Sequence, residues 1–184
     1  MKILITGGLG HIGSYILQNI NKIKIIKKIY IIDDLSTQRY SSLFGLKKSN
    51  KKIYFLQKDL SKKNALKKFT KVDVVLNLAS ITDAAESLKI KRRIYKINLG
   101  IFDNILKYCK KNSSKLIHIS STSVYGEQKG LINEMCQNLR PKSPYAEIKV
   151  IEERKLKSMK KQIKFISYRF GTISGFSPGM RFHT

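Results

Sequence analysis

The chain has 184 residues, of which 42% are hydrophobic and 27% charged. That length is enough for one domain with its own core, and the composition excludes a disordered or fibrous protein. Lys and Arg number 37 against 12 Asp and Glu, and this net charge of +25 first suggests a polyanion partner. The bias, however, combines 30 Lys and 26 Ile with 5 Ala, as A/T-rich codons would, and the lysines are dispersed in pairs. We therefore expect no specific nucleic-acid partner.

Cysteine usage and hydropathy narrow the class further. Cys109 and Cys136 are too far apart for a C-x-x-C pair, so the sequence predicts neither a disulfide scaffold nor a metal site. No run of about 18 apolar residues occurs, which argues against a membrane partner. The N-terminus passes directly from Lys2–Thr6 into glycines, which leaves no room for a signal peptide. These features predict a cytoplasmic location.

Short apolar segments alternate with helical ones along the chain. Segments rich in Ile, Val, Tyr and Phe predict strands at Lys2–Thr6, Lys28–Asp33, Lys52–Gln57, Val72–Leu78, Lys115–Ser120 and Ile163–Phe170. Helices are expected at residues 11–20, 61–69, 91–111 and 144–161, the last with Ser143 as its N-cap and Pro144 at its first position. This alternation predicts an α/β fold, with a doubly wound parallel sheet and helices on both faces.

A glycine-rich loop follows the first expected strand. Residues 6–13 read TGGLGHIG, so Gly8, Gly10 and Gly13 satisfy G-x-G-x-x-G, and Gly7, Gly10 and Gly13 satisfy G-x-x-G-x-x-G. Glycines at these spacings allow a tight turn, close approach of the backbone to a pyrophosphate, and close packing of helix on strand. The helix N-terminus then offers backbone N–H groups and a partial positive charge to the anion. The loop predicts a phosphate site, with a flexible turn as the alternative.

A carboxylate follows at the end of the second expected strand. Asp33 comes 20 residues after Gly13, the spacing at which an acidic residue binds the ribose hydroxyls of a dinucleotide. No arginine adjoins it in the sequence, which disfavours the 2′-phosphate of NADP. The alternative is that Asp33 and Asp34 are solvated turn residues. The spacing favours a cofactor site, and NAD is the predicted cofactor.

Two further patterns carry chemistry. Tyr145 and Lys149 form Tyr-x-x-x-Lys, and residues four apart share one helix face, so the ammonium is expected near the phenol. A nearby positive charge stabilises the phenolate, the form that accepts a proton as a general base. Residues 120–126, SSTSVYG, follow the fifth expected strand, where a doubly wound sheet binds its ligands. The alternatives are an aromatic contact beside a surface lysine, and an ordinary Ser/Thr-rich turn.

Together these segments resemble the extended short-chain dehydrogenase/reductase superfamily, in particular its NAD-dependent nucleotide-sugar epimerases and dehydratases. The shared segments occur in the family's order along nearly the whole chain: TGGLGHIG at 6–13, the aspartate after the second strand, KDL at 58–60, NLAS at 77–80, SSTSVYG at 120–126, SPYAEIK at 143–149 and RFGTISGFSPGMRF at 169–182. The resemblance implies a Rossmann-type NAD-binding domain over residues 1–184, cut short before a carboxy-terminal substrate domain.

The resemblance also implies roles for single residues. Tyr145 is the implied acid/base, Lys149 the residue that holds the nicotinamide ribose, and Ser121, four residues before Tyr125, the assisting hydroxyl. The implied activity is epimerisation of a nucleotide-diphosphate sugar through a transient keto-sugar, with hydride passing to NAD and back. The implied cofactor-binding residues are Gly7, Gly10, His11, Ile12, Gly13, Asp33, Asp34, Asp59, Leu60, Leu78, Ala79, Ser80, Tyr145 and Lys149.

A homodimer through helices 91–111 and 144–161 is a further implication of the resemblance. The apolar residues of these two helices fit the core face of a single chain equally well: Ile94, Ile97, Ile101, Ile105, Ile148 and Ile151. The sequence by itself therefore leaves the oligomeric state open.

The sequence departs from the family pattern in ways that bear on function. Dehydratases carry an Asp-Glu pair after the catalytic hydroxyl, and here the corresponding residues are Thr122 and Ser123, which disfavours dehydration. The usual Asn-x-x-Gly is shortened to Asn98-Leu99-Gly100, which leaves the role of Asn98 open. Beside the epimerase stand two alternatives, a dehydrogenase or reductase with net turnover of cofactor and a non-catalytic NAD-binding module.

Overall fold

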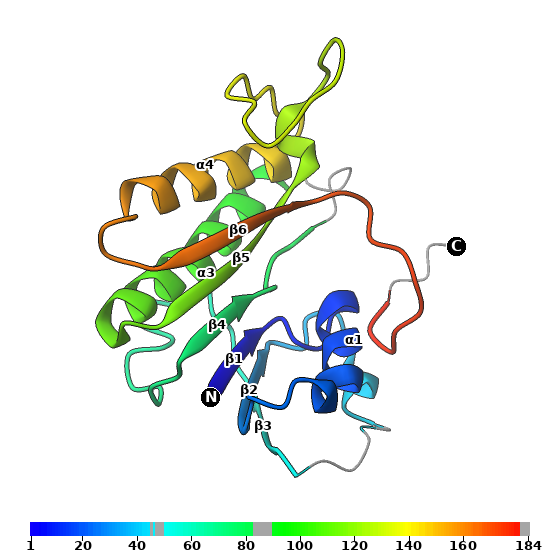
Figure 1. Ribbon diagram of the computed structural model, residues 1–184, viewed down its shortest axis with the longest axis vertical. Helices are drawn as coiled ribbons and strands as arrows, with labels where there is room; N and C mark the ends of the chain where they lie inside the picture. Colours follow the sequence, from blue (N-terminus) through cyan, green and yellow to red (C-terminus); the bar gives the residue numbers. More distant parts are fainter. Residues whose placement is uncertain (45, 47–49, 83–89, 181–184) are drawn as a thin grey trace.

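A computed structural model of the chain describes residues 1–44, 46, 50–82 and 90–180. Its strands form one six-stranded parallel sheet in the order β3-β2-β1-β4-β5-β6 (Figure 1). The strands are β1 (Lys2–Thr6), β2 (Lys28–Asp33), β3 (Lys52–Gln57), β4 (Val74–Asn77), β5 (Lys115–Ser121) and β6 (Phe165–Phe170). The strand order reverses between β1 and β4, which confirms the predicted doubly wound sheet.

The strand bounds follow the predictions closely, and two of the differences are explained by hydrogen bonds outside the sheet. The first three strands begin and end at the predicted residues. Val72 lies outside β4 because its N–H is donated to the Tyr108 hydroxyl rather than to a neighbouring strand. Ile163 lies outside β6 because its N–H is donated to the carbonyl of Met159, where the preceding helix ends. Apolar content thus included buried residues that precede the first residue of each of these strands.

Helices cover both faces of the sheet (Figure 1). α3 (Lys91–Asn112) and α4 (Pro144–Ser158) pack together on one face, and α1 (His11–Asn19) lies on the other; short 3-10 helices occur at η1 (Ile20–Lys22) and η2 (Tyr40–Leu43). Successive residues of β1 point to opposite faces, so Leu4 joins the core under α3 and α4, while Ile3 and Ile5 join the core under α1. The sheet is therefore buried on two sides around its middle strands, as a parallel sheet requires.

The prediction of a helix over residues 61–69 is wrong. These residues, all of them described, form bends and turns. Asn64 has a φ of 59°, and this left-handed conformation interrupts a right-handed helix. Ala65 and Leu66 are nevertheless buried in the core shared with α3. The apolar spacing that suggested a helix reflects the burial of a compact loop.

The α4 helix begins as predicted, and its packing bears on the expected dimer. Ser143 Oγ accepts the N–H of Ala146 at 3.2 Å, and Pro144 is the first helical residue. Most of the isoleucines that a dimer face would need are at most 7% exposed within the chain itself, namely Ile94, Ile101, Ile105 and Ile148. These side chains belong to the core of one chain, and the homodimer stays a prediction.

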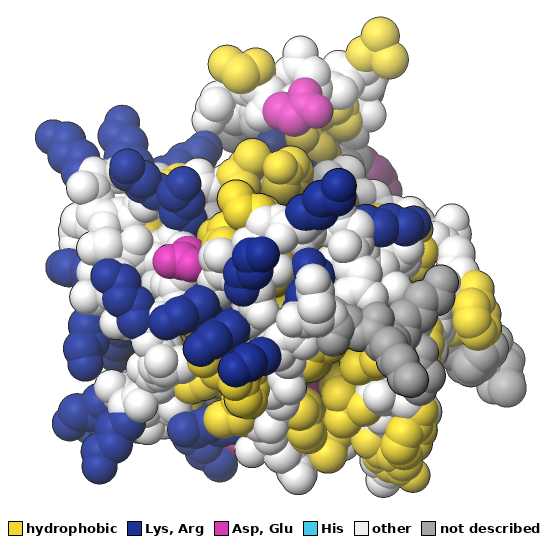
Figure 2. All heavy atoms as spheres, turned by 60° about the horizontal axis from the view of Figure 1, so that its bottom comes forward, with side chains coloured by type: hydrophobic (Ala, Val, Ile, Leu, Met, Phe, Trp, Pro, Cys, Tyr) yellow, Lys and Arg dark blue, Asp and Glu magenta, His cyan; other side chains and the backbone are white. Residues whose placement is uncertain are grey.

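Most of the basic side chains lie on the surface, and Lys149 is a buried exception. Figure 2 shows Lys and Arg side chains scattered over much of one face, with few acidic ones between them. Within the described ranges, no helix is long and apolar enough to cross a membrane, and no three His, Cys, Asp or Glu residues are grouped as a metal site would need. Cys109 is buried and Cys136 is partly buried, and both are free thiols. The expectation of no nucleic-acid partner stays a prediction.

Candidate active site

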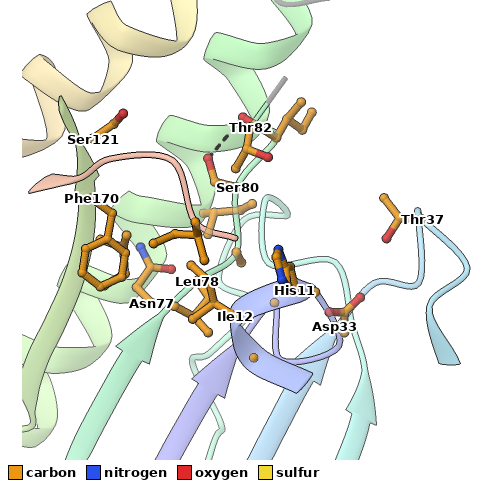
Figure 3. A pocket seen from close by; sticks show the side chains of 18 of the residues that line it. His11, Ile12, Asp33, Thr37, Asn77, Leu78, Ser80, Thr82, Ser121 and Phe170 are labelled. Carbon is orange, nitrogen blue, oxygen red and sulfur yellow. Dashed lines mark hydrogen bonds between the residues drawn. The ribbon is translucent and has the colours of Figure 1, made fainter. Parts of the chain in front are cut away.

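A cavity of about 670 Å³ opens at the carboxyl ends of the strands, where the strand order reverses. Its walls come from the loop after β1, the ends of β2, β4 and β5, the first turns of α4 and the segment after β6 (Figure 3). The volume falls within the range of small-molecule sites. Open parallel sheets bind ligands at this place because the connections leaving the two central strands diverge to opposite faces.

The glycine-rich loop forms one wall, and two of its glycines are sterically required. Gly7 has a φ of +62°, and a Cβ there would lie 2.7 Å from the Ala79 backbone. A Cβ on Gly13 would lie 2.4 Å from the carbonyl oxygen of Gly8, so a larger residue would push α1 away from the loop. Gly10 caps α1 without a side-chain acceptor for the first-turn N–H groups. A helix start of this kind binds an anion through those N–H groups and the helix dipole.

Asp33 stands at the end of β2, beside this loop (Figure 3). Its Oδ2 accepts the N–H of Leu9 at 3.1 Å, and its Oδ1 accepts the N–H of Leu35 at 3.1 Å. Burial raises the pKa of the Asp33 carboxyl, and the two backbone donors and the charge of Arg39 offset part of that rise. The fold thus brings Arg39 to the cavity wall that holds Asp33. No arginine adjoins Asp33 in the sequence, and Arg39 reaches this wall only through the fold.

An Asp33→Ala variant should bind NAD about 10- to 100-fold more weakly, because a hydrogen bond to a charged group contributes about 1.5–3 kcal/mol. The affinity for NADP should fall much less, because Arg39 remains on the same wall, where it can contact the 2′-phosphate. Calorimetric titration of wild type and variant with both dinucleotides gives the ratio of NAD affinity to NADP affinity. Asp103→Ala, which changes an aspartate paired with Lys155 on the helix surface, serves as the control. An unchanged ratio of NAD to NADP affinity would refute the ribose assignment.

The turn after β5 presents the Ser121 hydroxyl to the cavity (Figure 3). The 3-10 helix η3 (Thr122–Tyr125) begins here, and Ser121 Oγ accepts both the N–H of Ser123, at 3.1 Å, and its hydroxyl, at 2.8 Å. A hydroxyl oxygen has two acceptor sites, and both are used. The Ser121 O–H is therefore left as a donor, the role that polarises a bound alcohol or carbonyl.

Tyr145 and Lys149 both line the cavity from α4, as their spacing predicts. The Lys149 ammonium nitrogen lies 5.6 Å from the centroid of the Tyr145 ring. Lys149 is only 3% exposed, and its Nζ donates to Glu152 Oε2 at 2.8 Å. The structure therefore brings a positive charge close to the phenol, with Ser121 on the same cavity.

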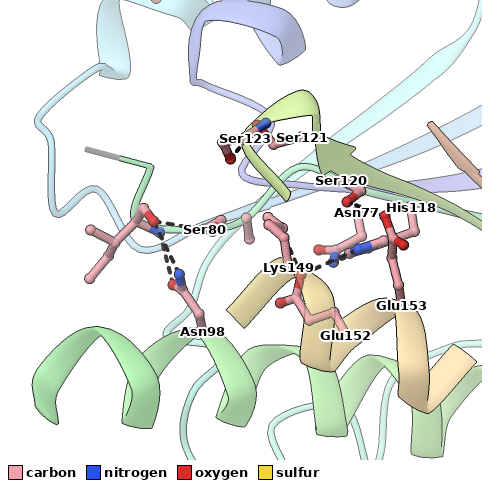
Figure 4. A network of polar contacts seen from close by, with 12 residues as sticks. Asn77, Ser80, Asn98, His118, Ser120, Ser121, Ser123, Lys149, Glu152 and Glu153 are labelled. Carbon is pink, nitrogen blue, oxygen red and sulfur yellow. Dashed lines mark hydrogen bonds and ion pairs between the residues drawn. The ribbon is translucent and has the colours of Figure 1, made fainter. Parts of the chain in front are cut away.

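Asn98 has a defined structural task. Its Oδ1 accepts the N–H of Ile81 at 2.9 Å, and its Nδ2 donates to the Ile81 carbonyl at 3.0 Å (Figure 4). Asn98 is 1% exposed, so this two-point contact fixes the backbone of the cavity wall at residues 80–82. Its role, which the shortened motif left open, is to hold that wall against α3.

The chain after β6 closes the cavity on another side. It crosses from β6 to α1 (Figure 1), where the His11 ring nitrogen Nε2 lies 2.7 Å from the carbonyl oxygen of Gly175. Ser177 Oγ donates to the His11 carbonyl at 2.9 Å, and the N–H of Gly179 is donated to Ser14 Oγ at 2.9 Å. Residues 170–175 line the cavity along this path. The glycine-rich loop and the end of the described chain are thus held together.

Nearly all of the predicted site residues line this one cavity: Gly7, Gly10, His11, Ile12, Gly13, Asp33, Asp34, Leu60, Leu78, Ala79, Ser80, Ser121, Tyr145 and Lys149. Asp59 is the exception, because its carboxylate accepts the N–H and the hydroxyl of Ser61, at 2.8 and 2.6 Å, in a local turn. Its place beside the adenine stays a prediction. Sequence reasoning missed Arg39, Asn77 and residues 170–175. The last two lie in segments that carried the resemblance, whereas no sequence signal pointed to Arg39.

A parallel sheet in this strand order, with a glycine-rich loop and a strand-end carboxylate at the reversal point, defines a dinucleotide-binding protein of the Rossmann type. Residues 3–184 match the model of the NAD dependent epimerase/dehydratase family, and the chain belongs to that family. The resemblance noted in the sequence is therefore confirmed. The family is NAD dependent, which also confirms the predicted cofactor.

Individual relatives are nucleotide-sugar enzymes by name. The chain is 31% identical over 192 residues to YtcB, an uncharacterized UDP-glucose epimerase of Bacillus subtilis, covering 100% of this chain and 60% of that one. It is 30% identical over 184 residues to a UDP-glucose 4-epimerase of Yersinia enterocolitica, covering 97% and 54%. Its structure is similar to UDP-glucuronic acid 4-epimerase of Bacillus cereus in complex with NAD, with a TM-score of 0.81, 29% identity and coverage of 98% and 60%. The chain thus spans little more than half the length of these relatives.

Proposed function

We propose that this chain carries the NAD site and the acid/base residues for epimerisation of a nucleotide-diphosphate sugar through a transient keto-sugar. The observation that carries the proposal is that Ser121, Tyr145 and Lys149 meet on the same cavity as the glycine-rich loop. The names of the relatives support a UDP-sugar as the substrate. Thr122 and Ser123 stand where dehydratases carry their acid pair, so dehydration is not proposed.

The residues present fit a dinucleotide. The first-turn N–H groups of α1 would hold the diphosphate, Asp33 the adenosine ribose and Lys149 the nicotinamide ribose. The main chain at 78–80, which precedes the Ile81 backbone held by Asn98, would line the path between the two riboses. When bound, NAD supplies the hydride acceptor and donor.

The chain's own groups would manage the proton. Tyr145, as the phenolate, takes the hydroxyl proton of the sugar carbon that is being oxidised, and it returns that proton when the carbon is reduced. The Ser121 O–H donates a hydrogen bond to the same oxygen, which carries developing negative charge in both directions. The Lys149 ammonium lies 5.6 Å from the centroid of the Tyr145 ring, which places a positive charge beside the group that exchanges the proton. Epimerisation requires that the keto-sugar present its other face to the cofactor between the two transfers.

Incubation of the chain with NAD and UDP-glucose tests this function. We expect a second UDP-hexose in the chromatogram, while NADH absorbance does not build up, because epimerisation returns the hydride. Steady production of NADH would instead indicate a dehydrogenase or reductase. Binding of NAD without any change in the sugar nucleotide would indicate a non-catalytic NAD-binding module.

A further inference from the structure

Three charged or titratable side chains, one of them that of Lys149, are buried together between α4 and β5 (Figure 4). Lys149, Glu152 and His118 are 3%, 2% and 0% exposed. Lys149 Nζ donates to Glu152 Oε2 at 2.8 Å, and His118 Nε2 lies 3.3 Å from the same oxygen. Burying charges costs free energy unless they are paired, so one carboxylate here compensates the ammonium. The motif Tyr-x-x-x-Lys contains neither Glu152 nor His118.

A series of buried polar contacts, called here the polar chain, joins this cluster to the carboxyl ends of β1 and β4, which border the cavity. Thr6 Oγ1 accepts the N–H of Ala79 at 3.3 Å and donates to Asn77 Oδ1 at 2.8 Å. This orients Asn77 Nδ2 toward His118 Nδ1, 3.4 Å away. A ring nitrogen that accepts from an amide carries no proton, so the His118 proton sits on Nε2 and faces Glu152. The polar chain therefore runs from the ends of β1 and β4, across β5, to the ammonium.

The electrostatic effect of Glu152 on Lys149 has a definite direction. Burial alone would lower the pKa of the Lys149 ammonium, but the adjacent carboxylate of Glu152 raises it above the ordinary lysine value. Burial lowers the pKa of His118, which keeps the imidazole neutral, and the ring is fixed against Phe102 of α3. Other ionisable groups that act on Lys149 are Tyr145 and Glu153 on α4 and His118 on β5. Glu152 is thus the group that offsets the cost of a buried ammonium.

We propose that Glu152, oriented by His118, is a positioning residue that keeps the Lys149 ammonium charged and in place to hold the cofactor ribose. The proposal rests on the role given above to Lys149 and adds the residue through which that lysine acts. His118 Nε2 lies 3.3 Å from Glu152 Oε2 without forming a hydrogen bond. His118 therefore acts on Glu152 through electrostatic and steric contact. The polar chain through Asn77 and Thr6 supplies a fixed backing for the carboxylate.

The test is the affinity of the 184-residue chain for NAD as a function of pH, followed by fluorescence or calorimetry from about pH 7 to about pH 10. Affinity of the wild-type chain should stay level over this range, because Lys149 stays charged. Glu152→Gln keeps the shape but removes the charge, so affinity should fall about tenfold per pH unit once the lysine deprotonates. Glu152→Asp keeps the negative charge, so its affinity for NAD should again be nearly independent of pH over this range.

Glu147→Gln is the matched control, because Glu147 lies on the same helix, 37% exposed, and outside the buried chain. It should follow the wild-type profile. If the wild-type chain does not bind NAD, or Lys149→Met binds it equally well, the proposed function fails. If Lys149→Met binds weakly while Glu152→Gln keeps the level profile, the role of Glu152 is overturned. If both Glu152 variants fail to fold, the pH dependence of NAD affinity in the wild-type chain is the test. An affinity that stays constant supports the proposal, and a loss of affinity below about pH 9 refutes it.

Discussion

A Tyr145→Phe variant is expected to lose epimerase activity by about 10²- to 10⁴-fold while it still binds NAD. The substitution removes only the hydroxyl that would accept and return the proton. The ring that the Lys149 ammonium faces at 5.6 Å is kept, and so is the start of α4, which Ser143 caps. The measurements are formation of the second UDP-hexose and a separate titration with NAD.

The control for this variant is Tyr15→Phe, which removes a hydroxyl from a tyrosine that is 57% exposed on α1. It should retain activity and NAD affinity. Loss of NAD binding together with activity in Tyr145→Phe would show that Tyr145 maintains the cavity rather than moving a proton. Full activity in Tyr145→Phe would assign the proton transfer to another group.

A Glu153→Ala variant is expected to lower the free energy of unfolding by about 3–5 kcal/mol, the cost of leaving one partner of a buried pair uncompensated. Glu153 accepts from Arg169 Nε and Nη2, at 2.9 and 2.7 Å, and from Ser120 Oγ at 2.6 Å. Arg169 also stacks over the Tyr125 ring, 4.9 Å from its centroid. This group of contacts ties α4 and β6 to the turn that presents Ser121. Urea unfolding of wild type and of Glu153→Ala measures the difference in the free energy of unfolding.

The size of this effect should depend on burial and on pH. Glu147→Ala breaks a half-exposed pair on the same helix and should cost at most about 1 kcal/mol. The hydrogen bonds from Arg169 and Ser120 lower the pKa of Glu153, so its contribution is complete above the ordinary glutamate pKa of about 4.3 and is lost as the pH falls below it. The gap between wild type and Glu153→Ala should therefore narrow in acid. A gap that is as small as that of Glu147→Ala would contradict the structural role of the cluster.

The expected effects have separate origins, which allows the two proposals to be distinguished. The Tyr145 variant is expected to change only the chemistry, the Asp33 variant the affinity for NAD relative to NADP, and the Glu153 variant mainly the stability. Glu152 is expected to act on the pH dependence of NAD affinity, which a purely structural role would leave level. A loss of stability in Glu153→Ala with unchanged pH dependence of NAD affinity would show that the two neighbouring glutamates have different tasks.

Local sequence was enough for much of the fold. The strands at Lys2–Thr6, Lys28–Asp33 and Lys52–Gln57 have the predicted bounds, because each is a short apolar run bounded by polar residues or glycine. The first two lie between parallel neighbours, and the third is the edge strand. The N-cap at Ser143 is equally local, since it depends on residues three apart. The segment 61–69 failed because the left-handed conformation of Asn64 depends on how that loop packs, which local apolar spacing does not encode.

The sequence by itself determined the glycine-rich loop, the strand-end aspartate and the Tyr-x-x-x-Lys pair, because each depends on spacing within one strand–turn–helix unit or one helix. Only the tertiary structure decided which distant residues complete the site. These contacts join separate elements of the chain: Arg39 lies on the same cavity wall as Asp33, Asn98 contacts Ile81, and His118 lies beside Glu152. The packing likewise showed that most of the apolar residues on α3 and α4 lie in the core of one chain, which local spacing does not reveal. Such contacts follow from the order of the strands in the sheet, which no local pattern records.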